Sequence, residues 1–215
     1  MALAFFDMDK TLLSKSSGVQ YVRYLWGRRE ISLREMLATG WISAQYSLNI
    51  LDFPKAISQL GRYVRDGDAA ATQALCDRFV VNELLQYLAP RALVRLREHQ
   101  AHGDQVWLLS ASTQFVVQPV AAHLGVRCGF TELEIIDGRF SGRIVGDSCY
   151  GEGKRIWGQR IAAQQDVPLA NVTFYSDSYS DKPLLDAVGH PVAVNPDRRL
   201  HAYALEQGWP IEMFY

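Results

Sequence analysis

Residues 3–11 read Leu-Ala-Phe-Phe-Asp-Met-Asp-Lys-Thr, a short apolar run that ends abruptly in two acids. A fully apolar run of this length, followed at once by charge, is typical of a buried parallel strand at its carboxyl end. We therefore predict a core strand over 3–6, with Asp7 and Asp9 just beyond it. Because the two acids are two residues apart, extended backbone would place both carboxylates on the same face.

Two later apolar runs end in polar residues in the same way. The run 106–109 is followed by Ser110, and the run 172–175 is followed by Ser176 and Asp177. Alternation of such strands with helices predicts an α/β fold, a parallel sheet covered by helices on both faces. Ligands of open α/β sheets bind beyond the carboxyl ends of the strands, so Asp7, Ser110 and Asp177 should meet at one crevice. A further strand is predicted over 191–194, and helices over about 90–101, 114–124, 154–165 and 182–187.

The segment between the first two strands differs from the rest of the chain. Residues 15–88 show helical periodicity and little strand signal, which predicts an inserted all-helical cap on a core formed by 1–14 and 89–215. We interpret the aromatic residues of the insertion as packing residues rather than a substrate cage. Within the core, Asp137-Gly138 lies between apolar residues and predicts a tight β-hairpin. The aromatic residues concerned are Tyr21, Tyr24, Trp26, Trp41, Tyr46 and Tyr63.

Composition narrows the class of partner. The chain has 22 Lys and Arg against 23 Asp and Glu, a formal charge of -1, so no net basic field would attract nucleic acid or an anionic membrane. We expect a small-molecule partner. The first residues lack a basic leader pattern and no apolar run is long enough to span a bilayer, which predicts a cytoplasmic protein. Cys76, Cys128 and Cys149 show no spacing typical of disulfides or zinc, which favours free thiols.

The paired acids of the first strand indicate a cation. Two carboxylates about 4 Å apart repel each other by about 4 kcal/mol at an effective dielectric constant of 20. A hard divalent ion relieves that repulsion, and Mg²⁺ takes a few carboxylates together with phosphate and water oxygens. Asp7, Asp177 and a backbone carbonyl would meet this description.

With a cation present, Asp7 and Asp9 could divide the work of phosphate-ester cleavage. An ionised Asp7 carboxylate can attack phosphorus and form an aspartyl-phosphate, which splits one difficult displacement into two easier ones. Asp9 would then protonate the leaving alkoxide and later deprotonate the hydrolytic water. This division requires environments that separate the pKa values of the two aspartates.

The remaining candidates would bind the phosphoryl group or support those that do. Ser110 with the amides of Ala111 and Ser112, together with Lys154, could donate to the phosphoryl oxygens. Asp177, nearest the strand end, is the better metal ligand, and Asp181 could orient Lys154 or a water from behind. Taken singly, Lys154 is more typical of a solvated lysine in a first helical turn, and Asp181 of a helix N-cap. A P-loop is rejected because position 148 is Ser and Arg155 follows Lys154.

These motifs together resemble the four motifs of the haloacid dehalogenase superfamily. They are Asp7-x-Asp9-x-Thr11, Ser110, Lys154 and Asp177-Ser178-x-x-Asp181, in the family's order and roughly its spacing. The insertion looks like the first cap class of that superfamily, and residues 132–143 resemble the hairpin segment of its phosphoserine phosphatase relatives.

The resemblance implies a Rossmann-like α/β core and a phosphoaspartyl mechanism. It implies Mg²⁺ bound by Asp7, Asp177 and the backbone carbonyl of Asp9, and phosphate bound by Ser110, Ala111 and Lys154. Thr11, Ser178 and Asp181 would support these groups. The chain departs from the family pattern at Lys10 and Ser176, where Gly is usual, and at 110–112, which read Ser-Ala-Ser rather than Ser-Gly-Gly. None of these departures removes a reactive group.

The sequence leaves alternatives open for the substrate and for the molecule that finally accepts the phosphoryl group. Phosphoserine phosphatases carry a Glu shortly after the first motif, whereas this chain has Ser-Lys-Ser-Ser at 14–17, which disfavours phosphoserine. Relatives with this compact arrangement include bacterial histidinol-phosphate phosphatases, and histidinol phosphate is the favoured substrate. The alternatives are phosphoserine or another amino-alcohol phosphate, a phosphotransferase of the same fold, and a noncatalytic binding module, which retention of the acids disfavours. The sequence makes no prediction of oligomeric state.

Overall fold

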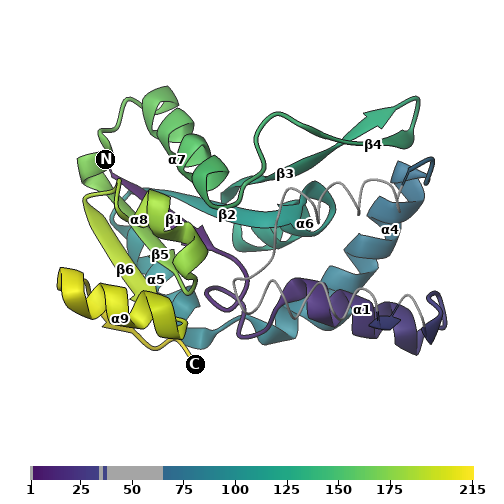
Figure 1. Cartoon of the computed structure of the whole chain (residues 1–215), viewed down its shortest axis with the longest axis horizontal. Helices are drawn as coiled ribbons and strands as arrows, with labels where there is room; N and C mark the ends of the chain where they lie inside the picture. Colours follow the sequence, from purple (N-terminus) through teal and green to yellow (C-terminus); the bar gives the residue numbers. More distant parts are fainter. Residues whose placement is uncertain (1, 34–35, 38–64) are drawn as a thin grey trace.

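The computed structural model describes residues 2–33, 36–37 and 65–215, and Figure 1 shows their arrangement. The strands are β1 (Leu3–Asp7), β2 (Gln105–Thr113), β3 (Arg127–Ile136), β4 (Arg139–Val145), β5 (Val172–Ser176), β6 (His190–Val194) and β7 (Ile211–Glu212). The helices are α1 (Ser17–Gly27), α4 (Ala69–Phe79), α5 (Pro90–Ala101), α6 (Gln114–Leu124), α7 (Glu152–Gln164), α8 (Lys182–Leu185) and α9 (Arg198–Gln207).

The strands form one seven-stranded sheet in the order β4-β3-β2-β1-β5-β6-β7, with β1 at its centre. Every neighbouring pair of these strands is parallel except the hairpin of β3 and β4. Asp7 lies opposite Leu109 of β2, and Phe6 lies opposite Tyr175 of β5. The residues that follow these partners therefore reach the same edge of the sheet. The predicted α/β class with a parallel core sheet is confirmed.

Helices cover both faces of the sheet. Alternate side chains of β1 point to opposite faces, so this one strand packs against helices on both sides. Ala4 and Phe6 pack in a cluster with apolar residues of α5 and α6. Leu3 and Phe5 pack on the other face with residues of α7, α8 and α9. The central strand is thus buried on both sides, which explains why its sequence is apolar without alternation.

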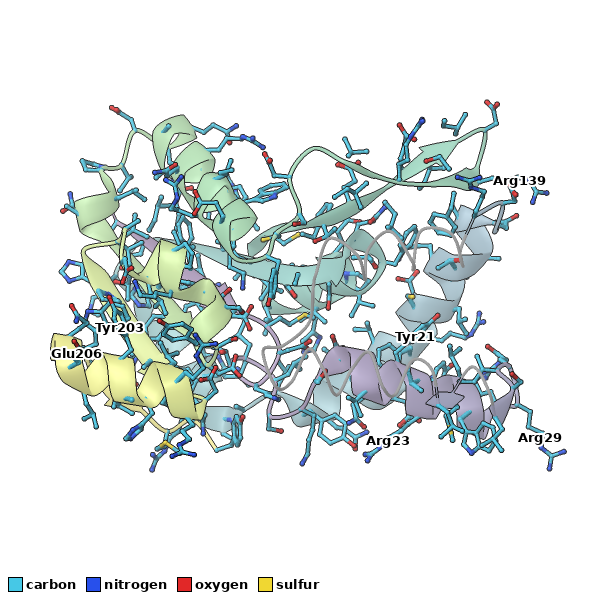
Figure 2. The ribbon with its side chains drawn as sticks, viewed as in Figure 1. Tyr21, Arg23, Arg29, Arg139, Tyr203 and Glu206 are labelled. Carbon is cyan, nitrogen blue, oxygen red and sulfur yellow. The ribbon has the colours of Figure 1, made fainter. Side chains whose placement is uncertain are left out.

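The predicted hairpin is present and extends beyond the sheet. Asp137 and Gly138 both have positive φ angles, 49° and 77°, as a two-residue type I′ turn requires. Arg139, at the start of β4, forms an isolated antiparallel β-bridge with the backbone of Asp68, just before α4. Its guanidinium donates to the carbonyl oxygen of Asp66. Figures 1 and 2 show this end of the hairpin beside α4. The hairpin therefore contacts the segment predicted to be the cap.

Some predicted boundaries differ from the observed ones. The second strand continues through Thr113 instead of ending at Leu109, because the backbone past an irregular step pairs again with β3. The helix-like run 69–88 is divided into α4, a π-helical turn (Val80–Leu84) and a 3₁₀ turn (Leu85–Tyr87). Pro90 ends that run, since the residue before a proline avoids helical backbone and Ala89 is extended.

The insertion is described only in part, since 34–35 and 38–64 lie outside the described residues. The division into a cap at 15–88 and a core at 1–14 and 89–215 therefore stays a prediction. Tyr21 and Tyr24 of α1 pack on Phe79 of α4 with ring centroids 5.1 and 5.4 Å away, as expected of packing residues. Trp26 is largely exposed, which differs from that expectation. Trp41, Tyr46 and Tyr63 lie outside the described residues.

Two smaller findings concern the cysteines and the helix lengths. Cys76, Cys128 and Cys149 are free cysteines in the structure. In the described part of the chain, no helix combines the length and the apolar character needed to cross a bilayer.

Candidate active site

A buried lysine joins two carboxylates from distant segments at the carboxyl edge of the sheet. Lys154 Nζ donates to Asp7 Oδ1 and to Asp181 Oδ2, each at 2.6 Å. Its side chain is only 2% exposed, so Lys154 is not the solvated lysine that its position alone would favour. The turn before it is tight, because a Cβ on Gly153 would lie 2.0 Å from the Ser148 carbonyl oxygen. The first turn of α7 thus brings Lys154 beneath the end of β1.

Burial and neighbouring charge act in opposite directions on these groups. Burial raises the pKa of Asp7 to about 7, although Lys154 opposes the rise. Burial alone would lower the pKa of Lys154, but Asp181 and Asp7 outweigh it and raise that pKa. Lys154 is therefore a permanent cation here, and it favours the ionised form of Asp7 that a nucleophile needs.

The negative charge of Asp177, just beyond β5, is compensated far less by neighbouring groups than that of Asp7. Thr11 Oγ1 lies 3.5 Å from Asp177 Oδ1, at the outer limit of a hydrogen bond. Burial, with the negative charge of Asp7 as the next cause, raises the pKa of Asp177 well above its ordinary value. The structure thus brings together two buried carboxylates that repel each other. Among the described residues, Asp7 forms an ion pair with a lysine, whereas Asp177 is only partly compensated by the more distant charge of Lys10.

Asp9 is held by the first helix of the insertion, a contact the sequence did not predict. The backbone N–H of Ser17 donates to Asp9 Oδ1 at 2.7 Å and its hydroxyl donates to Oδ2 at 3.0 Å. Burial raises the pKa of Asp9, and the bonds from Ser17 oppose that rise. Ser16-Ser17 before an apolar periodic run does signal a helix start, but not which carboxylate the helix would face. Asp7 and Asp9 therefore have different hydrogen-bond partners.

The irregular part of β2, residues 110–112, carries the predicted phosphate-binding groups. Ser110 and Ala111 are buried, and the hydroxyl of Ser110 accepts a hydrogen bond from the Ser112 amide at 3.2 Å. The Ser112 amide, predicted to donate to phosphate, is thus engaged within the same segment. The Ser112 hydroxyl lies 3.1 Å from that of Ser17. The end of β2 and the start of α1 are therefore direct neighbours.

Ser176, where the family pattern has Gly, positions the loop after β5. Its hydroxyl donates to Asp181 Oδ2 at 2.7 Å and accepts from the Ser178 amide at 3.2 Å. Asp181 stands at the N-cap position of α8, but its side chain makes no hydrogen bond that caps the helix, contrary to what its position alone suggested. It instead bonds to Lys154 and Ser176. Ser178 shares a hydroxyl contact of 2.8 Å with Ser180 and lies at the edge of this network.

The donor set fits Mg²⁺ only if groups other than side chains contribute. Among the described residues, no group of three or more His, Cys, Asp or Glu side chains gathers as a metal site. Asp7 and Asp177 nevertheless provide two buried, mutually repelling carboxylates that a cation would relieve. Mg²⁺ commonly binds through one or two carboxylates and completes its shell with substrate and water oxygens. A main-chain oxygen such as that of Asp9 could supply a further ligand.

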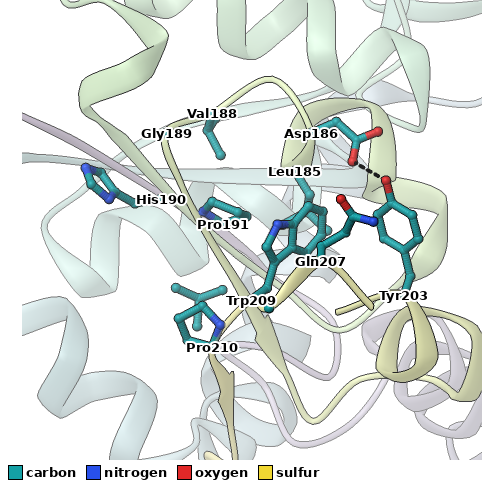
Figure 3. A pocket seen from close by; sticks show the side chains of 12 residues that line it. Leu185, Asp186, Val188, Gly189, His190, Pro191, Tyr203, Gln207, Trp209 and Pro210 are labelled. Atoms are coloured by element: carbon teal, nitrogen blue, oxygen red, sulfur yellow. Dashed lines mark hydrogen bonds between the residues drawn. The ribbon is translucent and has the colours of Figure 1, made fainter. Parts of the chain in front are cut away.

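A surface pocket lies at the other end of the sheet from these residues (Figure 3). It is lined by His190 and Pro191, which begin β6, and by Tyr203 and Trp209 around the end of α9. The predicted site residues follow the carboxyl ends of β1 and β5. The pocket is therefore separate from the candidate site.

Comparison with known proteins agrees with this geometry. The model of the haloacid dehalogenase-like hydrolase family matches residues 4–186. A phosphoserine phosphatase of Mycobacterium tuberculosis is 34% identical over 221 residues, which cover 99% of this chain and 71% of that protein. A histidinol-phosphatase of Neisseria meningitidis is 30% identical over 222 residues, 99% of this chain and 98% of that protein. A crystal structure of a Bordetella pertussis protein of unknown function has a TM-score of 0.88 at 30% identity, and the match covers 99% of this chain and 98% of that one.

Proposed function

The chain belongs to the haloacid dehalogenase-like hydrolases, and from that premise we propose a Mg²⁺-dependent phosphomonoesterase that forms an aspartyl-phosphate on Asp7. The observation that carries the proposal is the meeting of Asp7, Lys154 and Asp181 through one buried ammonium. These residues come from three separate segments of the chain. Their meeting is therefore not a local consequence of the geometry of one turn.

The residues divide the proposed reaction into two balanced steps. An Asp7 carboxylate oxygen attacks phosphorus, the ester oxygen departs, and Asp9 gives it a proton. Asp9 then takes a proton from water as the water attacks phosphorus, which releases inorganic phosphate and restores Asp7. Lys154 and the donors at Ser110 and Ala111 hold phosphoryl oxygens through both steps. Mg²⁺, when bound by Asp7, Asp177 and the Asp9 carbonyl, would neutralise charge on the phosphoryl group.

We propose histidinol phosphate as the substrate. The end-to-end match with a histidinol-phosphatase of nearly the same length supports this choice. The 34% identity to a phosphoserine phosphatase favours phosphoserine as the second candidate. The stretch 14–17, Ser-Lys-Ser-Ser, argues against the second, because phosphoserine phosphatases carry a Glu that binds the amino acid in this region. Both candidates are small phosphorylated metabolites.

Phosphate release from a metabolite panel tests both the class and the substrate. The panel contains histidinol phosphate, phosphoserine and other amino-alcohol phosphates, each with Mg²⁺ and with EDTA. We expect Mg²⁺-dependent release that is fastest with histidinol phosphate. An added acceptor alcohol that captures the phosphoryl group would instead identify a phosphotransferase. Absence of any cleavage or transfer would contradict the proposed function.

Asp177→Asn is expected to weaken Mg²⁺ binding. The amide keeps the shape of the side chain but removes the negative charge that would bind the cation. We expect the Mg²⁺ concentration for half-maximal activity to rise at least tenfold, which corresponds to about 1.4 kcal/mol. Titration of phosphate release against Mg²⁺ measures this change, and an unaltered midpoint would remove Asp177 from the cation site.

Ser17→Ala is expected to impair Asp9 as an acid. Loss of a hydrogen bond to a charged group costs roughly 1.5–3 kcal/mol, so kcat should fall about tenfold or more with alkyl phosphates. The fall should be smaller with p-nitrophenyl phosphate, whose leaving group needs little protonation. Ser14→Ala is the matched control, because the Ser14 hydroxyl donates to the Tyr87 carbonyl at 3.1 Å and contacts no site carboxylate. Equal losses with both leaving groups would argue against this role of Ser17.

A further inference from the structure

The loop that carries the two catalytic acids is tied to a residue 205 positions away. The hydroxyl of Tyr215 donates to the main-chain oxygen of Lys10 at 3.1 Å. Lys10 lies between Asp9 and Thr11, inside the first motif. The contact therefore reaches the backbone of the site rather than one of its reactive side chains.

Lys10 occupies a backbone conformation that needs such support. Its φ angle is 57°, in the left-handed region that glycine adopts freely and other residues adopt at a cost. The surrounding turn is closed by two main-chain bonds, from Leu12 to Asp7 at 3.3 Å and from Leu13 to Met8 at 2.8 Å. Both bonds bypass the Lys10 carbonyl, to which Tyr215 donates. The rotation about Lys10 sets the angle between the peptide before it and the peptide after it.

The segment that carries Tyr215 is itself firmly held. Phe214 is buried, and its N–H donates to Asn195 Oδ1 at 2.8 Å, while Asn195 Nδ2 donates to the main-chain oxygen of Tyr215 at 3.2 Å. Two residues beyond Asn195, the N–H of Asp197 donates to the carbonyl oxygen of Asp177 at 2.8 Å. One short segment, 195–197, therefore holds both the loop of Asp177 and the residue that holds the loop of Lys10.

The hydroxyl of Tyr215 remains protonated and can therefore donate a hydrogen bond. Burial, with a smaller contribution from the negative charge of Asp177, raises the pKa of Tyr215 to about 12. The phenol therefore keeps its proton at neutral pH. The residue as a whole is 50% exposed, so removal of its hydroxyl leaves no cavity in the core.

We propose that Tyr215 is a positioning residue for the cation site. Its hydrogen bond to Lys10 fixes the peptide groups on either side of Lys10, and the peptide before Lys10 carries the Asp9 carbonyl. The segment 195–197 then ties this loop to Asp177, so the proposed ligands are set relative to one another. The inference rests on the proposed function, because it assigns Tyr215 to the Mg²⁺ site described there.

Tyr215→Phe tests the inference by removing the hydroxyl alone. We expect the dissociation constant for Mg²⁺, measured by calorimetry on the metal-free full chain, to rise roughly 3- to 10-fold. In activity assays, the midpoint for Mg²⁺ should shift more than kcat falls. The matched control is Tyr203→Phe, because the Tyr203 hydroxyl donates to Asp186 at the same distance, 3.1 Å, in the separate pocket (Figure 3). Figure 2 shows where Tyr203 lies in the whole chain. Both variants lose one surface bond, so their melting temperatures should fall by similar small amounts.

A second experiment, in a Lys10→Gly background, distinguishes a positioning role of Tyr215 from a general loss of stability. With Lys10→Gly the left-handed conformation no longer has a steric cost, so the effect of Tyr215→Phe on Mg²⁺ affinity should shrink. Wild-type Mg²⁺ affinity in Tyr215→Phe, or an equal loss in Tyr203→Phe, would overturn the inference and leave the proposed function intact. Failure of the wild-type chain to bind Mg²⁺ would overturn both.

Discussion

Asp7→Asn should abolish turnover while the protein stays folded. The amide cannot supply the anionic oxygen that attacks phosphorus, and removal of a covalent nucleophile lowers kcat by a factor on the order of 10⁴ or more. Asn is close to Asp in shape and still offers an oxygen to Lys154 Nζ, so the melting temperature should change little. Phosphate release and thermal unfolding measured on the same preparation check both statements.

The phosphoenzyme itself provides a second readout of this prediction. Rapid acid quench of the wild-type chain with substrate should trap one phosphoryl group on Asp7, which mass spectrometry of peptides can locate. Asp186→Asn is the control, since Asp186 pairs with Lys182 at the surface and lies outside the candidate site. Substantial activity in Asp7→Asn, or a phosphoryl group on another residue, would remove Asp7 from the role of nucleophile.

The meeting of Asp7 and Asp177 at one edge of the sheet could be predicted from the sequence. Each acid follows an apolar run that reads as a buried parallel strand, and parallel strands end at one edge of a sheet. The hairpin at Asp137-Gly138 was equally predictable, because few residue pairs adopt two successive positive φ angles. These features are encoded locally, and the fold only has to bring the strands into register.

The contacts of Ser17 and Tyr215 could not be predicted in the same way. A serine at a helix start and a tyrosine in a short exposed segment have no pattern that names a partner. Ser17 finds Asp9 because of how α1 leaves the core, and Tyr215 finds Lys10 because Asn195 fixes the backbone beside it. Such contacts depend on the packing of elements distant in sequence. They are also the contacts that set the orientation of the reactive groups.

The buried charges of the site are unbalanced in the structure. Asp7, Asp9, Asp177 and Asp181 are all buried, and among the described residues Lys154 is the buried cation that faces them. Burial raises the pKa values of Asp7 and Asp177, so protons or a divalent cation are needed to compensate the excess carboxylates. The phosphate dianion of a substrate would add further negative charge. The balance at the site therefore depends on Lys154.

Lys154→Met should cost both activity and stability. The methionine fills similar volume but leaves Asp7 and Asp181 buried without a cation, and breaking a buried ion pair costs about 3–5 kcal/mol. Activity should fall by a factor of at least about 10², since a donor to the phosphoryl oxygens is also lost. Denaturant unfolding and phosphate release measure the two effects. Lys182→Met is the control, because its ion pair with Asp186 is exposed and such pairs contribute no more than about 1 kcal/mol.

A second substitution separates the two roles of Lys154. Asp181→Asn in the Lys154→Met background removes one of the carboxylates left without a partner, and Ser176 can still donate to the amide oxygen. The double variant should therefore recover part of the lost stability, whereas its activity should stay low because the lysine that donates to the phosphoryl oxygens is still missing. If activity returned together with stability, Lys154 would serve only to hold the fold together. If neither returned, the loss would come from the packing of the methionine, and the electrostatic account of this site would be wrong.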